Sequence, residues 1–240
     1  MKTLAKHLSV FVTILLLGVA FTSCNSDSDD DRPEYVNEFM IIKSDGTNVW
    51  FENGNGKYFA VDVPASLKLN EQDGRRALVY YYVVKEKVTP GYDKTIGLMA
   101  LQLCSMGTFV TDVADAEELE TYGKASLSFD NQSYNFSDGW FDILVDYYQY
   151  PETEHTFALC VPTPNLIPAD AVVPDGYVYM EMRHDCDTDG SKLEKIRDIV
   201  SFRVSDEYNP VTNPTIKGYY IKMLDPQGGT NYVTLEFKKQ

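Results

Sequence analysis

From residue 35 onward the pattern of apolar and polar positions is strand-like, and several stretches alternate with a period of two. Val200, Phe202 and Val204, for example, are separated by single polar residues. Such alternation is typical of a β-strand with one buried face and one exposed face. A helical pattern stands out only at 114–122, so the sequence predicts an all-β protein.

The first predicted domain covers residues 35–112 and contains short strands joined by tight turns. Asp45-Gly46 and Asn53-Gly54 are pairs that favour hairpin turns. About five short strands bury their edges best by closing on themselves, so we expect an OB-like small barrel. The expected strands are Val36–Lys43, Val49–Phe51, Tyr58–Val63, Arg76–Lys87 and Thr95–Met106, with Phe109–Thr111 ending the unit.

The second predicted domain covers residues 124–240 and follows a helical connector at 113–123. Acidic residues near the start of that helix suit the helix dipole, and Gly123 is a suitable C-cap. The strands beyond it have one polar and one apolar face, which predicts an antiparallel β-sandwich. The main expected strands are Trp140–Tyr150, Thr156–Pro162, Tyr177–His184, Ile196–Val204, Lys217–Leu224 and Asn231–Lys238.

The start of the chain has the layout of an export signal. Basic Lys2 and Lys6 precede the uncharged, mostly apolar run Leu8–Phe21, which is too short for a bilayer span of about 20 residues. Small residues then lead to Cys24, so residues 1–23 read as a lipoprotein signal peptide whose cleavage exposes Cys24 for acylation, with palmitate as an expected acyl group. The alternative is an ordinary secreted protein that is cut near Ser23.

Residues 24–34 form a short polar and acidic tether that cannot bury enough apolar area to fold. One interpretation is a solvated spacer. The other is a sorting signal, because acid-rich stretches after the lipidated cysteine resemble the surface-export tethers of some Gram-negative lipoproteins. Both interpretations predict an outer-membrane lipoprotein, and the second predicts that it faces the extracellular side.

The acidic charge of the chain argues against binding to nucleic acid and against direct docking on anionic lipid headgroups. The full sequence has 21 Lys and Arg against 36 Asp and Glu. Removal of residues 1–23 takes away Lys2 and Lys6 and no acid, so the mature chain carries 19 − 36 = −17. Nucleic-acid binding requires phosphate neutralisation, so no nucleic-acid partner is expected. Contact with the membrane is expected through the N-terminal lipid rather than a basic patch.

Three cysteines and two histidines remain in the predicted mature chain. Cys104 and Cys160 lie in apolar strands and are expected to be buried, whereas Cys186 lies between two aspartates. An odd number of cysteines does not make a full disulfide framework. His155 and His184 are expected to be surface or strand-end residues, and no zinc site is predicted without three or four convergent ligands.

One strand carries a candidate ligand platform. Period-two alternation places Trp140, Asp142, Asp146 and Tyr148 on the same face of Trp140–Tyr150. Aromatic rings beside carboxylates suit a sugar or a peptide. The two aspartates are about 13 Å apart along a strand, too far for a glycosidase pair, so we expect binding rather than catalysis. The alternative is that this face packs on the first domain.

A candidate calcium site follows the strand Tyr177–His184. Asp185, Asp187 and Asp189, followed by Gly190, match the first half of a calcium-binding loop. The twelfth position of such a loop requires a bidentate Glu, but Ile196 stands there. A solvated acidic turn is therefore the expected structure, with calcium binding as the alternative.

Two further stretches carry a resemblance to a known family. They are Gly74–Tyr82 with the later Gly91–Asp93, and Tyr179–Asp185 with Asp198–Phe202. Together with the lipid signal and the acidic tether, they resemble the NigD-like lipoproteins. The resemblance covers essentially the whole chain and implies an N-terminal OB-like domain, a C-terminal β-sandwich and no established enzymatic activity.

These observations lead to one expected function and two alternatives. The expected function is that of a lipid-anchored, surface-exposed binding or accessory module that is not an enzyme, uses no cofactor and has a protein or glycan partner. One alternative is a carboxylate-based enzyme acting on glycans. The other is a purely structural component of the cell envelope.

Overall fold

A computed structural model describes residues 35–84, 88–129, 131–149, 154–186, 194–225 and 229–237. The predicted signal peptide, the acidic tether and Cys24 lie outside these residues. Within the described part of the chain, none of the helices has both the length and the apolar character needed to span a bilayer.

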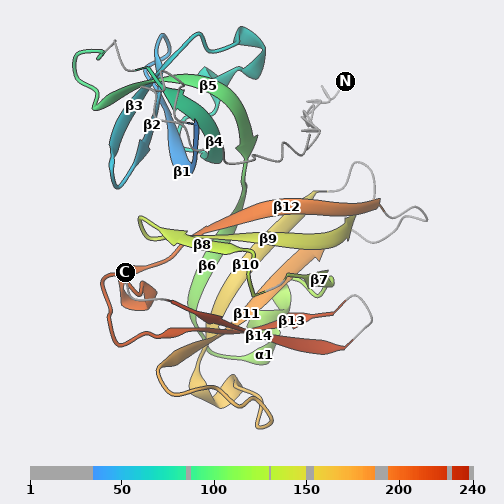
Figure 1. Cartoon of the computed structure of the whole chain (residues 1–240). Coiled ribbons are helices and arrows are strands. Elements are labelled where there is room, and N and C mark those ends of the chain that lie inside the picture. The colour runs from blue at the N-terminus through green and yellow to red at the C-terminus, as the bar shows by residue number, and fades with distance from the viewer. Residues whose placement is uncertain are drawn as a thin grey trace, which may run out of the picture.

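The first domain is a closed barrel of five strands, which forms the upper part of Figure 1. The strand order is β1-β2-β3-β5-β4, and β1 closes the barrel by pairing with both β2 and β4. The OB-like barrel predicted from the strand pattern is therefore confirmed. The strands are β1 (Tyr35–Ser44), β2 (Val49–Asn53), β3 (Gly56–Val61), β4 (Arg76–Val83) and β5 (Lys94–Leu103), and two 3-10 helices, η1 (Ala65–Leu67) and η2 (Leu69–Glu71), connect β3 to β4.

Alternate side chains of the barrel strands fill its interior, as the period-two pattern requires. Together with Leu69 of η2, they form a hydrophobic core that is separate from the core of the second domain. Its buried members are Met40, Ile42, Phe51, Tyr58, Ala60, Leu69, Ala77, Val79, Tyr81 and Ile96.

The second domain is one large, strongly curled sheet, in the lower part of Figure 1. The order along the sheet is β14-β13-β11-β10-β6-β12-β9-β7, with β8 paired to β9 outside this path. The strands are β6 (Ser105–Val113), β7 (Leu127–Ser128), β8 (Tyr134–Ser137), β9 (Trp140–Gln149), β10 (His155–Pro162), β11 (Tyr177–Cys186), β12 (Glu194–Arg203), β13 (Gly218–Leu224) and β14 (Thr230–Glu236), and the 3-10 helices are η3 (Pro164–Leu166) and η4 (Asp206–Tyr208).

The sheet is mixed, whereas the sequence predicted an antiparallel sandwich. β6 lies parallel to both β10 and β12, and β11 lies parallel to β13. The physical reason is that alternation defines the faces of a strand but not the direction of its neighbours. The curl still brings apolar faces of distant strands together, so the core contains Phe141 of β9, Leu159 of β10, Met182 of β11 and Ile221 of β13.

The boundary between the two domains lies earlier than the sequence suggested. β5 leads directly into β6 through the single residue Cys104, and β6 belongs to the second sheet. The barrel therefore ends at Leu103 rather than at residue 112. Long apolar runs continue without a turn at this point, which is why the sequence pattern does not mark the change.

The helix α1 (Ala116–Thr121) is not the connector between the domains that we predicted at 113–123. It begins after Asp115, whose side chain accepts a hydrogen bond from the backbone N–H of Glu118 at 2.7 Å. Leu119 packs against Val113 and Cys160 of the second domain, because it is the apolar residue on the inner face of this short helix. In Figure 1 the helix lies among the strands of the lower domain, away from the barrel.

Candidate functional site

The barrel covers part of the platform that was predicted on β9. Asp142 is only 1% exposed. Arg76 of β4 donates two hydrogen bonds of 2.8 Å to its two carboxylate oxygens, and Ser201 of β12 donates a third at 2.6 Å. The prediction that Asp142 binds a ligand is therefore wrong, because its oxygens are already held by the protein.

Trp140 belongs to the same junction between barrel and sheet. The Arg76 guanidinium lies 5.4 Å from the Trp140 ring and 5.5 Å from the Phe39 ring of β1. The Arg203 guanidinium lies 5.5 Å from the same Trp140 ring. Cations at this distance from an aromatic ring are attracted to its face. The indole therefore helps to hold a buried cation, which is the alternative the sequence left open for this face.

The other half of the predicted platform remains at the surface. Arg197 of β12 donates hydrogen bonds of 2.7 and 2.9 Å to Asp146, and Lys195 lies 3.2 Å from the same carboxylate. The hydrogen bond from Arg197 is the main reason that the pKa of Asp146 is lowered. Tyr148 is 42% exposed. Asp142 is buried and Trp140 half-buried at the junction, whereas Asp146 is half-buried and Tyr148 exposed toward the other end of β9, so the four predicted residues do not form one site.

The predicted calcium loop lies largely outside the described residues. Asp187 and Asp189 are not among them. Asp185 is exposed and lies within β11, opposite Thr156 of β10. The strand therefore extends one residue past the first predicted ligand, to Cys186.

A second aromatic surface lies on the outside of the barrel and was not predicted as a site. Trp50 of β2 and Phe59 of β3 are cross-strand partners, and both are half-buried and outside the barrel core. The ring of Tyr92, from the turn before β5, lies 6.0 Å from the Trp50 ring and 5.0 Å from the Phe59 ring. We call these three residues the barrel aromatic surface.

Polar contacts fix the position of this surface. The indole N–H of Trp50 donates to Glu52 at 2.8 Å, and Lys57 lies 3.4 Å from the same carboxylate oxygen. Asp93 follows Tyr92 and accepts a hydrogen bond of 2.8 Å from the backbone N–H of Lys57. The turn that carries Tyr92 is thus held against β3. Outward aromatic residues on adjacent strands, one before and one after the Asn53-Gly54 turn, were the signal in the sequence.

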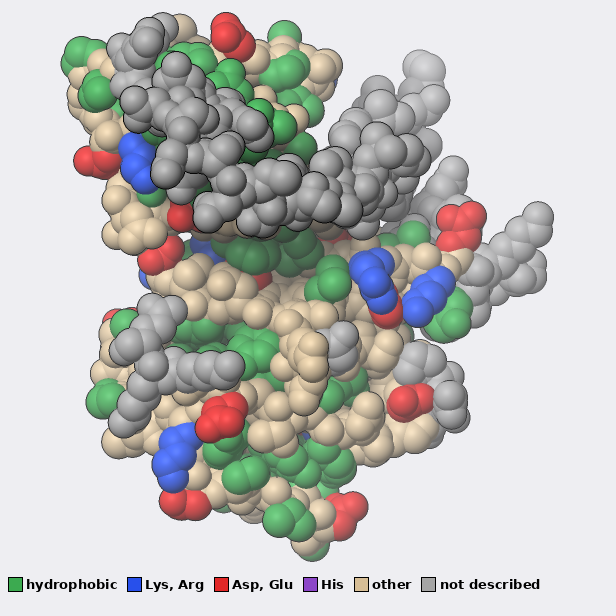
Figure 2. Space-filling model, in the orientation of Figure 1, with side chains coloured by type: hydrophobic (Ala, Val, Ile, Leu, Met, Phe, Trp, Pro, Cys, Tyr) green, Lys and Arg blue, Asp and Glu red, His purple; other side chains and the backbone are tan. Residues whose placement is uncertain are grey.

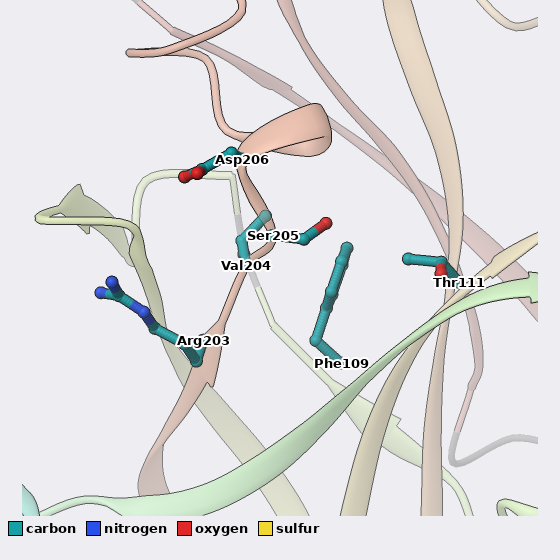
Figure 3. A pocket seen from close by; sticks show the side chains of 6 residues that line it. All are labelled: Phe109, Thr111, Arg203, Val204, Ser205 and Asp206. Carbon is teal, nitrogen blue, oxygen red and sulfur yellow. The ribbon is translucent and has the colours of Figure 1, made fainter.

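A shallow pocket lies beside the junction, between β6 and the end of β12. Its volume is about 530 Å³, and its lining comes from β6 and from the segment that follows β12 (Figure 3). Arg203 donates to the backbone oxygen of Asp138, so its guanidinium already has a partner on the protein. The lining residues are Phe109, Thr111, Arg203, Val204, Ser205 and Asp206.

A cluster of metal-binding side chains lies at the far end of β10 and β11. His155, His184 and Cys186 each bring a ligand atom within 4.8 Å of the others. We predicted that both histidines are surface or strand-end residues. His155 is the first residue of β10, as predicted, but His184 is buried within β11, and their proximity to Cys186 was not predicted. The missing information was the pairing of β10 with β11, which sets His155 opposite Cys186.

Asp142 and Glu181, the fully buried carboxylates of the described residues, face cations rather than each other. Asp142 is paired with Arg76, as described above. Glu181 is 2% exposed, lies 3.1 Å from Lys222, and accepts hydrogen bonds from Tyr179 and Arg183. On the face of the molecule in view in Figure 2, acidic and basic side chains are interspersed and neither sign forms a continuous patch.

Comparison with known proteins places the fold. No protein-family model matches this sequence, and neither does any curated protein sequence. Among solved structures, a NigD-like immunity protein from Bacteroides caccae is 15% identical with a TM-score of 0.53, and the match covers 87% of this chain and 99% of that one. The fold is that of a NigD-like protein. At this identity the likeness concerns the fold alone.

Two further structures share the NigD-like fold. A protein of unknown function from Bacteroides vulgatus, DUF1344, is 18% identical with a TM-score of 0.62, and the match covers 86% of this chain and 92% of that one. A candidate lipoprotein from Bacteroides fragilis is 13% identical with a TM-score of 0.56, with 86% and 99% of the two chains covered. The barrel and the curled sheet thus occur together in these proteins as well.

Proposed function

We propose that this chain is a lipid-anchored, non-enzymatic binding module of the outer membrane that faces the extracellular side and contacts an oligosaccharide through the barrel aromatic surface. The single observation that carries the proposal is the position of Trp50, Phe59 and Tyr92. They lie on the β2–β3 face and the β4–β5 loop, where OB barrels bind oligonucleotides and oligosaccharides.

The charge of the chain decides between these two ligand classes. A net charge of −15 opposes binding of a phosphate backbone. Neutral sugars stack on aromatic rings and accept or donate hydrogen bonds through their hydroxyl groups. Glu52 is 29% exposed in its side chain and lies beside Trp50, so it offers an acceptor at the edge of the rings. An oligosaccharide therefore fits this surface better than a nucleic acid.

The absence of catalysis in this proposal is supported by the buried acids. Glycosidases use two carboxyl groups about 5–9.5 Å apart on either side of the substrate. Asp142 and Glu181 are instead each neutralised by a basic side chain. Lipid anchoring is supported by the signal pattern before Cys24 and by the fold likeness to a candidate lipoprotein.

Binding is tested on the mature chain with Cys24→Ala, which removes the acylation site and leaves the folded part unchanged. The probes are defined neutral oligosaccharides from several polysaccharide classes, immobilised as a panel. We expect binding to at least one class, a loss of at least tenfold in affinity with Trp50→Ala or Tyr92→Ala, and little change with Tyr148→Ala as a matched aromatic control. Failure to bind any member, or binding that survives both barrel variants, would overturn the ligand assignment.

Anchoring is tested separately in cells. Wild-type protein is expected in the membrane fraction with acyl chains on the mature N-terminus, and Cys24→Ala is expected in the soluble fraction. Protease added to intact cells should cleave the wild type if it faces outward. Replacement of Asp27, Asp29, Asp30 and Asp31 by Asn should then keep the protein inside the outer membrane, where the protease cannot reach it. Equal cleavage of the two proteins would show that the acidic run is only a spacer.

A further inference from the structure

The cluster of His155, His184 and Cys186 has the geometry of a metal site, and none of its residues takes part in the proposed oligosaccharide binding. β10 and β11 are antiparallel neighbours, with His155 opposite Cys186 and Phe157 opposite His184. Directly opposed residues share a face of the sheet, as do residues two apart on one strand. All three donors therefore project from the same face, at the margin of the domain core.

The two imidazoles are oriented toward each other. Nδ1 of His155 lies 2.8 Å from Nε2 of His184. Nδ1 of His184 lies 3.3 Å from the backbone oxygen of Ser126, a contact that favours a hydrogen on that nitrogen. Nε2 of His184 then presents its lone pair to the cluster. A histidine ligand usually has its other ring nitrogen bonded to a carbonyl or a carboxylate in this way.

Packing holds the rings in place before any ion arrives. His184 is 1% exposed and stacks on Phe157, with ring centroids 4.8 Å apart and an interplanar angle of 6°. The Tyr147 ring lies 4.9 Å from His155 and 5.0 Å from His184. Such packing fixes the ligand geometry and keeps water from the inner side.

The segment before β7 packs against β11 beside the histidine cluster, on the side away from β10. The N–H of Ala125 donates to the backbone oxygen of His184 at 2.8 Å. Gly123 has φ +104, and a Cβ there would lie 2.4 Å from the same oxygen. Only glycine adopts this conformation readily at such close approach. Gly123 thus lets the chain bring Ser126 to His184.

We propose that His155, His184 and Cys186 bind a divalent transition-metal ion, with zinc as the best fit, through two nitrogens and one sulfur. Hard cations prefer oxygen ligands, whereas imidazole and thiolate together suit zinc. Three protein ligands leave a fourth position for water or an exogenous group, as in zinc sites that exchange ligands. This site is independent of the barrel aromatic surface.

Binding requires only small changes. Two nitrogens about 2.0–2.1 Å from a tetrahedral zinc are about 3.3–3.4 Å apart, so the histidines must separate by roughly 0.5 Å. The proton between the rings moves to Nε2 of His155, and the Cys186 thiol releases its proton to solvent as sulfur binds the ion. Asp185, which precedes Cys186, adds negative charge that favours a bound cation.

The test uses the mature chain with Cys24→Ala after treatment with a chelator, titrated with Co²⁺ alone. We expect one Co²⁺ per chain, with a thiolate-to-cobalt charge-transfer band and the visible bands of a tetrahedral ion, all bleached by one equivalent of Zn²⁺. Cys186→Ser should abolish the charge-transfer band, and His155→Gln should weaken binding at least tenfold. Cys160→Ser, which replaces a buried cysteine outside the cluster, is the matched control and should keep the band.

Thermal unfolding provides a second readout that does not depend on cobalt spectra. Zn²⁺ should raise the melting temperature of the wild-type protein and leave that of the Cys186→Ser variant unchanged. Circular dichroism verifies that each variant is folded. A wild-type chain that shows no charge-transfer band, or a band that persists in Cys186→Ser, would overturn the proposal.

Discussion

Trp50 and Trp140 have nearly the same local sequence setting and different surroundings. Each lies on a strand of the structure and has a carboxylate two residues later, Glu52 or Asp142. Glu52 accepts a hydrogen bond from Trp50 and stays partly exposed. Asp142 is buried and accepts hydrogen bonds from Arg76 of the other domain. The difference shows that alternation identifies the face of a strand, while tertiary structure determines what covers that face.

The largest effect is expected from breaking the buried ion pair. Asp142→Ala leaves the Arg76 guanidinium without its carboxylate in a site where both side chains are 0% exposed. Removing one partner of such a pair costs about 3–5 kcal/mol. We expect a loss of this size in the free energy of unfolding, measured with urea.

The double replacement Arg76→Met with Asp142→Leu is the control for that prediction. It removes both charges and fills the space with apolar groups, so it should recover much of the lost stability. A single Asp142→Ala variant that loses less than about 1 kcal/mol would show that the junction is not tightly packed.

The two tryptophans should differ in what their truncation costs. Trp140→Ala removes a ring that contacts two guanidinium groups at the junction, and we expect a loss of about 2–3 kcal/mol. Trp50→Ala removes a ring outside the barrel core, and we expect about 1 kcal/mol or less. Both values come from urea unfolding, and the reverse order would contradict the contrast between the two surfaces.

The sequence could predict much of the barrel but little of this contrast. The Asp-Gly and Asn-Gly turns and the alternating strands were enough to place β1 to β5. The partner of Asp142 is 66 residues away along the chain, and no local pattern links the two. The histidine cluster was missed for a similar reason, because the strand pairing that joins His155 to Cys186 is itself a tertiary feature.

A pH experiment can sharpen the description of the junction. Asp198 of β12 is a carboxylate whose pKa is raised by burial, although Ser105, the first residue of β6, donates a hydrogen bond of 2.5 Å to it. A raised pKa means that the folded state binds the proton more tightly than the unfolded state. The associated stability is present below the unfolded value of 3.8 and is lost as the pH rises through the folded value.

Asp198→Asn removes this titration. The free energy of unfolding of the wild type, taken relative to Asp198→Asn, should therefore fall as the pH rises from about 3 to 7. Parallel curves for the two proteins over that range would mean that Asp198 has an ordinary environment.

The smallest effect is expected at the exposed end of β9. Asp146→Asn weakens surface ion pairs with Arg197 and Lys195, and such pairs contribute about 1 kcal/mol or less. We expect a loss within that limit at low salt, which disappears at about 1 M NaCl because salt screens exposed charges. A large loss that is independent of salt would mean that Asp146, like Asp142, belongs to a buried ion pair.

The proposed partner contacts the barrel aromatic surface rather than the face of β9, and NMR can test this directly. The chain has two tryptophans, so a ¹⁵N–¹H spectrum of the folded protein contains two indole N–H signals, assigned with Trp50→Phe and Trp140→Phe. On addition of the oligosaccharide that binds most tightly in the panel, we expect the Trp50 signal to shift and the Trp140 signal to stay in place. A shift of the Trp140 signal with Trp50 unchanged would contradict it.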